Sequence, residues 1–267
     1  MHCIAEEKIS MLQEKHRVLI SVITINLNNL EGLRNTVPSV LSQDFHSFEY
    51  IVVDGDSTDG SIAYLNSLES EIQNLIIEKD NGIYDAMNKG IRSARGEYLL
   101  FLNSGDFFYK KESLTNLVKA GHSADIVYGN MIVDEEGQKR IQQYPANLNT
   151  LYFLFETLPH PSTLIKKDLF RKFGNYNTKY RIVSDWAFFL DAIIGGKATY
   201  IHVDEEVSVF NLKGISSQSE SYRIIRQEMN HYLSARYPGA YILYKILWSL
   251  RYYPKRILQK VGLVSEQ

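Results

Sequence analysis

Polar side chains follow three apolar runs of the sequence, and their types are those that hold nucleotides and metal ions. The runs cover residues 18–25, 49–54 and 97–102, and they suit strands buried on both faces of a parallel sheet. In an open α/β sheet, ligands bind just beyond the carboxyl ends of the strands. The candidates at these ends are Thr24, Asn26, Asp54, Asp56 and the tetrapeptide Asn103-Ser104-Gly105-Asp106. Together they predict a polar rim able to hold ribose hydroxyls and a metal-bound diphosphate.

Structural explanations compete with this interpretation. Asp56 and Asp59 are common helix N-caps, and Asn103 and Asp106 belong to residue types that build turns. Asp54 is harder to explain as a cap, because it directly follows three apolar strand residues. Since three strand ends carry such groups, a binding rim is favoured over three unrelated turns.

The elements that must position these residues alternate along roughly the first 110 residues. A short strand at 75–78 adds to the three apolar runs, and helical patterns fill the intervals at 30–43, 60–70 and 83–94. This β-α-β-α order predicts an α/β fold with a Rossmann-like, mostly parallel central sheet and helices on both faces.

The rest of the chain has a mixed pattern. We expect helices at 5–16, 148–156 and 183–194, and strands at 126–133, 138–143, 198–202 and 206–211. A helical pattern then runs from 218 to about 262, with breaks near Pro238-Gly239 and Pro254.

No linker-like segment divides the chain, so residues 1–217 are expected to form one catalytic domain. Its nucleotide-binding half covers about 18–110 and its acceptor-binding half about 111–217. Residues 218–267 are expected to be a helical, basic-aromatic C-terminal extension.

Composition excludes several classes of protein. Cys3 is the only cysteine of the 267 residues, so a disulfide framework and a cysteine metal site are excluded, and a cytoplasmic location is expected. A net charge of −2 gives no reason to expect a nucleic-acid partner. No uninterrupted run of about 18 apolar residues occurs, so a soluble or peripheral protein is expected. The sequence also lacks Gly-x-Gly-x-x-Gly after its first strand, a P-loop and a Gly-x-Ser-x-Gly elbow, which disfavours dehydrogenases, P-loop NTPases and α/β hydrolases.

Several motifs, in this order, resemble the family 2 inverting glycosyltransferases. The resemblance covers residues 18 to about 216, and its motifs are 21–26, 36–43, 50–60, 80–90, 96–106, His160-Pro161-Ser162-Thr163 and Ser184-Asp185-Trp186. It implies a GT-A fold and transfer of a sugar from a nucleotide-diphosphate sugar, expected to be a UDP-sugar. The acceptor would be a hydroxyl of a saccharide or lipid-linked saccharide, as in bacterial cell-surface polysaccharide synthesis.

The resemblance also implies roles for individual residues. Asp185 matches the catalytic base, and Asp106 lies in the segment that binds Mg²⁺ or Mn²⁺. Asn103 and Gly105 stand where the family carries aspartates, so Asp106 is the only carboxylate of that segment and metal binding is expected to be weak. The residues expected around the nucleotide or donor sugar are Thr24, Asn26, Asp54, Asp56, Asp85, Asn88, Lys89, Asn103 and Ser104.

Three further residues are assigned by their position. Lys213 lies where many family members have a histidine, and its charge suits the diphosphate. His160 and Trp186 are assigned to the acceptor; His160 lies between two prolines on a rigid segment, and a hydrogen bond inside the fold is the alternative. For Asp185, the alternative or additional role is to cap the helix that follows.

The C-terminal stretch from Tyr237 to Val264 combines aromatic and basic residues without an acidic one. This mixture predicts a helix lying on an anionic membrane, which would place the protein at the inner face of the cell membrane. The alternatives are a helix packed on the catalytic domain and a dimer contact. Two other functions compete with the transferase: a catalytically degenerate nucleotide-binding or assembly subunit of the same fold, and a sugar-1-phosphate nucleotidyltransferase. The latter normally has a glycine-rich basic loop after the first strand, which residues 26–30 do not resemble.

Overall fold

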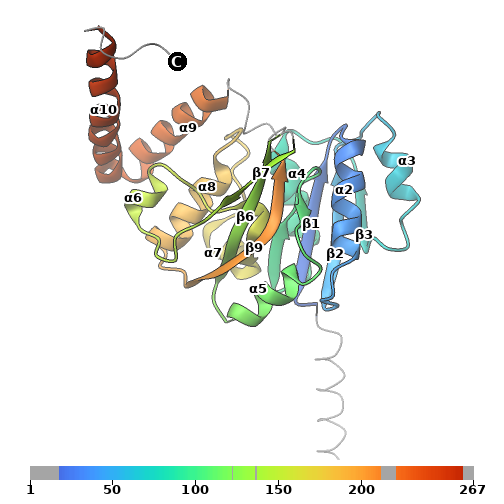
Figure 1. Cartoon of the computed structure of the whole chain (residues 1–267). Helices are drawn as coiled ribbons and strands as arrows, with labels where there is room; N and C mark the ends of the chain where they lie inside the picture. Colours follow the sequence, from blue (N-terminus) through green and yellow to red (C-terminus); the bar gives the residue numbers. More distant parts are fainter. Residues whose placement is uncertain (1–17, 122, 136, 212–220, 261–267) are drawn as a thin grey trace, which may run out of the picture.

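The computed structural model describes residues 18–121, 123–135, 137–211 and 221–260, with side chains described as far as residue 250. The helix predicted at 5–16 and the predicted diphosphate contact Lys213 lie outside the described residues. Figure 1 shows one twisted sheet with helices packed on it, and a pair of C-terminal helices at the end of the molecule far from α3.

The first half of the sheet is parallel, as the sequence predicted. Its strands are β1 (Ile20–Asn26), β2 (Phe48–Asp54), β3 (Asn74–Ile77) and β4 (Tyr98–Phe101). They pair in the order β3-β2-β1-β4, and all three pairings are parallel. The carboxyl ends of β1, β2 and β4 therefore meet at one edge of the sheet.

The second half of the sheet is mixed. Strand β8 (Thr163–Lys166) joins β4 antiparallel, and the order continues through β6 (Ile126–Glu135), β9 (Tyr200–Asn211) and β5 (Phe107–Phe108). Only the β6–β9 pairing is parallel here, and β7 (Gln138–Gln142) pairs antiparallel with β6. Two predicted strands, at 198–202 and 206–211, are one strand. In the pairing of β6 with β9, the register shifts on either side of Asn130. These shifts accommodate the polar residues that lie between the two predicted strands, so β9 continues without a turn.

Helices cover both faces of the sheet, as predicted. They are α2 (Leu30–Leu41), α3 (Ser61–Asn66), α4 (Ile83–Ser93), α5 (Ser113–Gly121), α6 (Thr150–Phe153), α7 (Lys167–Phe173), α8 (Ser184–Phe189), α9 (Ser221–Arg236) and α10 (Pro238–Lys260). A π-helix over Leu190–Gly195 continues α8. Alternate residues of β1 enter different cores: Ile20 and Val22 pack on the side of α2, and Ile23 and Ile25 on the side of α4. A strand apolar on both faces is thereby buried on both faces.

The C-terminal helices follow the predicted pattern with one correction. Helix α9 ends at Arg236 and α10 begins at Pro238, which is the expected break. The break expected near Pro254 was wrong, because α10 continues to Lys260. A proline removes one backbone donor from the helical ladder, and the turns on both sides remain helical.

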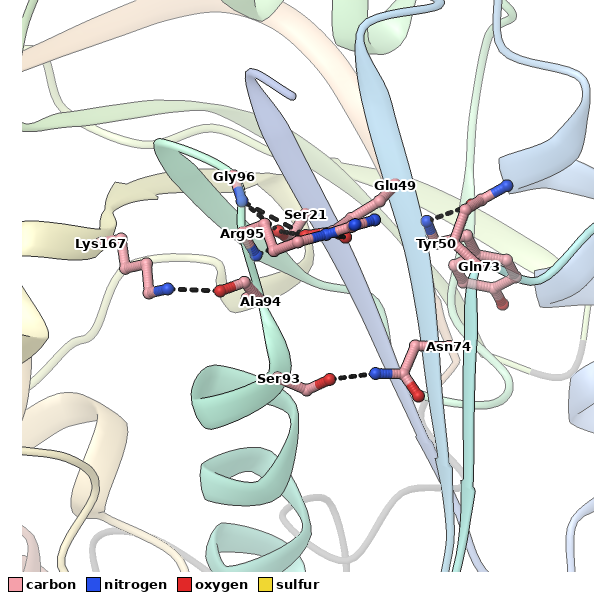
Figure 2. Close-up of polar contacts among 10 residues, drawn as sticks. All are labelled: Ser21, Glu49, Tyr50, Gln73, Asn74, Ser93, Ala94, Arg95, Gly96 and Lys167. Atoms are coloured by element: carbon pink, nitrogen blue, oxygen red, sulfur yellow. Dashed lines mark hydrogen bonds and ion pairs between the residues drawn. The ribbon is translucent and has the colours of Figure 1, made fainter. Parts of the chain in front are cut away.

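A buried carboxylate joins three segments at the amino ends of the strands, away from the predicted rim (Figure 2). Glu49 Oε1 accepts from Ser21 Oγ at 2.6 Å and from the backbone N–H groups of Arg95 and Gly96 at 2.5 and 3.2 Å. Its Oε2 accepts from Arg95 Nε at 2.8 Å. Burial alone would raise the pKa of Glu49, but these donors and the charge of Arg95 lower it below its ordinary value.

Candidate functional site

A cavity of about 550 Å³ opens at the carboxyl ends of β1 and β4. Its wall combines the ends of these strands with the start of α4, the turn before α8 and the end of β9. Among the predicted site residues, it is lined by Asn26, Asn103, Ser104, Asp106, His160 and Asp185. The structure therefore brings residues from both predicted halves of the catalytic domain to one cavity.

Asn26 forms part of the wall, and Asp54 lies behind it. Asn26 Nδ2 donates to Asp54 Oδ2 at 2.7 Å, while Asp54 also accepts from the N–H and Oγ of Ser57. Asn26 Oδ1 is buried and has no hydrogen-bond partner among the described residues. Such an unpaired acceptor costs about 1–3 kcal/mol, which a donor brought by a ligand would offset. Asp54 thus fixes the side-chain amide of Asn26 in an orientation that leaves Asn26 Oδ1 free to accept from a ligand.

Two other predicted nucleotide contacts lie outside the cavity wall. Thr24 is fully buried; its Oγ1 donates to Leu102 O at 2.7 Å and accepts from Tyr50 at 3.0 Å. Asp56 is exposed and has a φ of 68°. Asp59 is not a helix N-cap, because Gly60 takes that position in α3 and Asn29 in α2. Its carboxylate instead accepts from the first backbone N–H group of each helix, those of Leu30 and Ser61.

The three predicted residues of α4 also lie outside the wall. Asp85 accepts from Asn81 N–H at 3.0 Å. Asn88 exchanges two hydrogen bonds with the backbone of Tyr176, at 2.8 and 3.0 Å, and so joins the two halves of the domain. Lys89 is buried, pairs with the carboxylate of Glu78 at 3.1 Å, and donates to the carbonyls of residues 78 and 79. Their contacts within the protein hold the wall in place.

The turn at 103–106 offers oxygen ligands for a cation. Asp106 is 5% exposed, and its Oδ1 accepts from Asn211 N–H at 3.2 Å. Burial raises the pKa of Asp106 to about 8 despite that hydrogen bond, and no ion pair to it is found in the described part of the chain. Asn103 Oδ1 is a second buried oxygen without a hydrogen-bond partner there. One carboxylate and one amide oxygen suit Mg²⁺ or Mn²⁺ when phosphates and waters complete the shell. Among residues 18–260 as described, no group of three or more His, Cys, Asp or Glu side chains is placed to hold a metal.

The turn itself is rigidly held. Thr36 Oγ1 donates to Asp106 O at 2.7 Å, and Asn29 Nδ2 donates to Ser104 O at 2.9 Å. The other end of the Asn29 amide caps α2 by accepting from Gly32 N–H at 3.0 Å. The position of the oxygen ligands is therefore set by α2.

Asp185 reaches the cavity from the first turn of α8. Its Oδ1 accepts from the Tyr84 hydroxyl at 2.7 Å, and the same hydroxyl lies within hydrogen-bond distance of Ile182 O. Burial, and then the charge of Asp185, raise the pKa of Tyr84 well above its ordinary value, so that hydroxyl remains a donor. The N-cap of α8 is Val183, and no side chain caps this helix. The capping role considered for Asp185 is therefore not observed.

Of the two residues predicted to contact the acceptor, only His160 lines the cavity. His160 stacks on Phe101 with ring centroids 4.7 Å apart, and its Nε2 lies 2.8 Å from the Tyr176 hydroxyl. Burial lowers the pKa of His160, which favours the neutral imidazole. Trp186 is buried in the core, where its Nε1 donates to Phe153 O at 2.7 Å. The structure thus places Trp186 behind the cavity wall.

Sequence reasoning missed several residues of the wall, including Tyr84, Arg181, Glu31, Asn35 and Asp80. Tyr84 belongs to one of the motifs quoted above, whereas Arg181 lies in a segment without periodicity. The described wall contains four carboxylates and one guanidinium, on Glu31, Asp80, Asp106, Asp185 and Arg181. A diphosphate entering this acidic cavity needs an accompanying cation.

The sequence is similar to known glycosyltransferases. A family model described as Glycosyl transferase family 2 matches residues 21–192. An uncharacterised glycosyltransferase of Mycobacterium tuberculosis (strain CDC 1551 / Oshkosh) is 34% identical over 181 residues, which are 66% of this chain and 69% of that protein. A PGL/p-HBAD biosynthesis glycosyltransferase of Mycobacterium bovis (strain BCG / Pasteur 1173P2) is 31% identical over 176 residues, 64% of this chain and 68% of that protein.

Solved structures share the fold. Staphylococcus aureus TarS 1–349 in complex with UDP-GlcNAc matches with a TM-score of 0.65 at 19% identity, over 80% of this chain and 66% of that one. The mannosyltransferase PcManGT of Pyrobaculum calidifontis, in complex with GDP-Man and Mn²⁺, matches with a TM-score of 0.61 at 17% identity, over 82% of this chain and 64% of that one. The chain therefore spans about two thirds of the solved chains named here. At these identities the likeness concerns the fold, which is of the GT-A type that the sequence predicted.

Proposed function

The chain belongs to glycosyl transferase family 2, and on that basis we propose that it is an inverting, hexosyltransferase-type enzyme. It moves a sugar from a nucleotide-diphosphate sugar to a hydroxyl of a saccharide or lipid-linked saccharide acceptor. The biosynthetic name of the M. bovis relative supports a place in the synthesis of bacterial cell-surface polysaccharide. Residues 1–217 form the catalytic domain in this proposal, and 218–267 its extension.

One observation carries the proposal: Asp185 lines the same cavity as the polar strand ends and the turn at 103–106. Asp185 Oδ1 is occupied by the Tyr84 hydroxyl, and its Oδ2 makes no hydrogen bond to any residue that the structure describes. The carboxylate is thus oriented by one oxygen and open at the other. This arrangement suits a general base beside a bound donor.

The reaction needs one proton acceptor and one stabilised leaving group. As the acceptor oxygen attacks the anomeric carbon, the bond from that carbon to the diphosphate oxygen breaks, and Asp185 takes the hydroxyl proton. Attack from the face opposite the leaving group inverts the anomeric centre. A positioned base of this kind contributes about 10²- to 10⁴-fold in rate.

We propose Mg²⁺ or Mn²⁺ as the cofactor, held by Asp106 and Asn103 together with the donor phosphates. When bound, the ion would offset the negative charge that grows on the departing nucleoside diphosphate. The acidic wall of the cavity and the Mn²⁺ in the P. calidifontis neighbour support this choice. Lys213, outside the described residues, is proposed as a further contact to the diphosphate.

For the donor we propose a UDP-sugar, with Asn26, Asn103 and Ser104 in contact with it. Thr24, Asp54, Asp56, Asp85, Asn88 and Lys89 complete the proposed donor region, mostly by holding its wall. TarS was solved with UDP-GlcNAc, whereas the mannosyltransferase was solved with GDP-Man. Thermal unfolding with UDP, GDP, dTDP and CMP, each with and without Mn²⁺, decides between the bases. A nucleotide at about 100 times its dissociation constant stabilises by about 2.7 kcal/mol, or roughly 5–10 °C for a domain of this size.

The experiment that tests the function is Asp185→Asn. An enzyme loses turnover in this variant and keeps its nucleotide-dependent thermal shift, because Asp185 acts on the acceptor proton. Turnover at the wild-type rate would reject Asp185 as the base. Nucleotide binding without turnover in the wild type, across a panel of donors and acceptors, would favour the degenerate binding subunit.

We also propose that the extension lies on an anionic membrane at the cytoplasmic face, where a lipid-linked acceptor is found. Helix α10 presents three apolar side chains at helical spacing to solvent: Ile242, Ile246 and Leu250 are 60%, 52% and 65% exposed. From Met229 to Ser265 the sequence has basic residues and no acidic one. This combination suits an interfacial helix. None of the described helices is both long enough and apolar enough to span a bilayer.

Sedimentation with vesicles tests this contact. The wild type should sediment with phosphatidylcholine vesicles containing phosphatidylglycerol and much less with pure phosphatidylcholine. Ile246→Ser should weaken the association, whereas Tyr222→Ser, which removes an exposed aromatic of α9, should not. Equal association of Ile246→Ser and the wild type would reject α10 as the contact.

A further inference from the structure

A carboxylate of the C-terminal extension holds the turn that precedes Asp185. Glu228, on α9, accepts from three consecutive backbone N–H groups: Oε1 from Arg181 at 2.6 Å, and Oε2 from Ile182 and Val183 at 3.0 and 3.2 Å. These donors lie directly before the first turn of α8. Val183 is the N-cap residue of α8, so Glu228 satisfies the backbone donors of the N-cap and of the two residues that lead into the helix.

Packing fixes α9 in the position from which Glu228 reaches the turn. Met229 and Leu233, on the same helix, are buried in the core that contains Trp186. Tyr232 packs edge-on against Trp186, with ring centroids 5.6 Å apart. Glu228 therefore projects from a helix whose following residues are anchored in the core.

The turn passes this constraint to Asp185 through one residue. Ile182 donates its N–H to Glu228, and its carbonyl lies within hydrogen-bond distance of the Tyr84 hydroxyl. The same hydroxyl donates to Asp185 Oδ1 at 2.7 Å. Glu228, Ile182, Tyr84 and Asp185 thus form a continuous hydrogen-bonded chain. Arg181, whose N–H is the first of the three donors, lines the cavity beside them.

We propose that Glu228 is a positioning residue for Asp185, so that helix α9 of the extension is part of the catalytic apparatus. This inference rests on the proposed role of Asp185 as the base. Glu228 is not among the residues that line the cavity; it acts by fixing the backbone from which Asp185 and the Tyr84 hydroxyl are aligned. A misplacement of about 1 Å at a reacting group costs on the order of 100-fold in rate.

A carboxylate is required at this position because all three partners are donors. Glutamine has one acceptor oxygen, and its amide nitrogen would face a backbone N–H. Glu228→Gln therefore loses at least one of the three hydrogen bonds and gains a donor–donor contact, while it keeps the volume of the side chain. Gln227→Ala is a matched control, because Gln227 is exposed on the same helix.

Two measurements test the proposal. The first is amide hydrogen exchange of residues 181–183, which needs no turnover and so stands apart from the proposed function. Exchange should be at least 10-fold faster in Glu228→Gln than in the wild type and unchanged in Gln227→Ala. The second is steady-state kinetics: kcat should fall about 10- to 100-fold in Glu228→Gln, with the dissociation constant of the nucleotide within about threefold of the wild type.

A double-mutant cycle separates positioning from general loss of stability. If Glu228 acts through Tyr84 and Asp185, then Glu228→Gln combined with Tyr84→Phe loses less kcat than the product of the two single losses. The pair Gln227→Ala and Tyr84→Phe should be multiplicative. Unchanged exchange at 181–183, or faster exchange with a wild-type kcat, would overturn the proposal. If the wild type has no turnover with any donor while exchange responds as expected, the proposed function fails, but the role of Glu228 in holding the turn at 181–183 is still supported.

Discussion

Replacing Tyr84 by phenylalanine removes the hydroxyl that holds Asp185 and leaves the ring in its core. The donor lies 2.7 Å from Asp185 Oδ1, and hydrogen bonds to charged groups contribute about 1.5–3 kcal/mol. The lower end applies here, because the single hydroxyl proton is shared between Asp185 and Ile182 O. Since each 1.36 kcal/mol of activation free energy is a factor of ten in rate, a loss of about 1.5 kcal/mol predicts a fall in kcat of roughly tenfold.

The effect acts through the orientation of the proposed base. Tyr84 supplies the hydrogen bond to Asp185 Oδ1, so without it the carboxylate is held less firmly beside the cavity. We therefore expect kcat to fall about tenfold, with the dissociation constant of the nucleotide within about threefold of the wild type.

The assay is transfer with saturating donor, together with nucleotide binding. Tyr176→Phe is the control, because Tyr176 belongs to the same aromatic cluster, with its ring 5.5 Å from that of Tyr84, but its hydroxyl bonds His160. The control should lose clearly less kcat than Tyr84→Phe. A wild-type kcat in Tyr84→Phe, with normal nucleotide binding, would refute the reasoning.

Three other predictions follow from the structure. Asp106→Asn removes the one carboxylate of the 103–106 turn, so the Mn²⁺-dependent part of the nucleotide thermal shift should disappear. The same part should disappear when EDTA is added to the wild type. If the Mn²⁺-dependent shift persisted in the variant, Asp106 would be rejected as a metal ligand. Gly32→Ala would place its Cβ 2.2 Å from Asn29 Nδ2 and 2.7 Å from Gly105 N. We therefore expect the free energy of unfolding, measured with denaturant, to fall by about 1–3 kcal/mol and nucleotide binding to weaken. Gly239→Ala is the control and should be neutral, because there is open space around Gly239. Glu49→Gln should lower the free energy of unfolding by about 3 kcal/mol at pH 7. Because the pKa of Glu49 is lowered in the folded state, the extra stability of the wild type is complete above the ordinary value of 4.5 and shrinks as the pH falls below it. Urea unfolding at pH 7, 5 and 3 measures this difference.

The parallel half of the fold was predictable because its signals are local. Four apolar runs separated by helical patterns specify buried strands and crossover helices without help from distant residues. The mixed half was predicted less completely, and β8, α5 and α7 were missed. Strand β8 has four residues and begins directly after the turn at His160–Ser162, so it is too short to show a period.

The sequence could not predict which of the candidate residues line the cavity and which are buried beneath its wall. Residue types at a strand end indicate which edge of the sheet binds a ligand, but not which side chains the neighbouring turn covers. Thr24 lies two residues further into β1 than Asn26, and the chain leaving β4 covers it by accepting its hydroxyl at Leu102 O. Glu228 was beyond sequence reasoning, because its partners are backbone groups 45 to 47 residues away, and backbone groups carry no sequence signal.

The position of Glu228 after all the strands of the sheet also has a consequence for synthesis on the ribosome. Domains fold as the chain emerges from its amino end, and the parallel half is complete early. The backbone donors at 181–183 then remain without their carboxylate until α9 has been made. A nascent chain can therefore form its parallel strands well before the wall that carries Asp185 is fixed, and α9, which is made after them, fixes that wall.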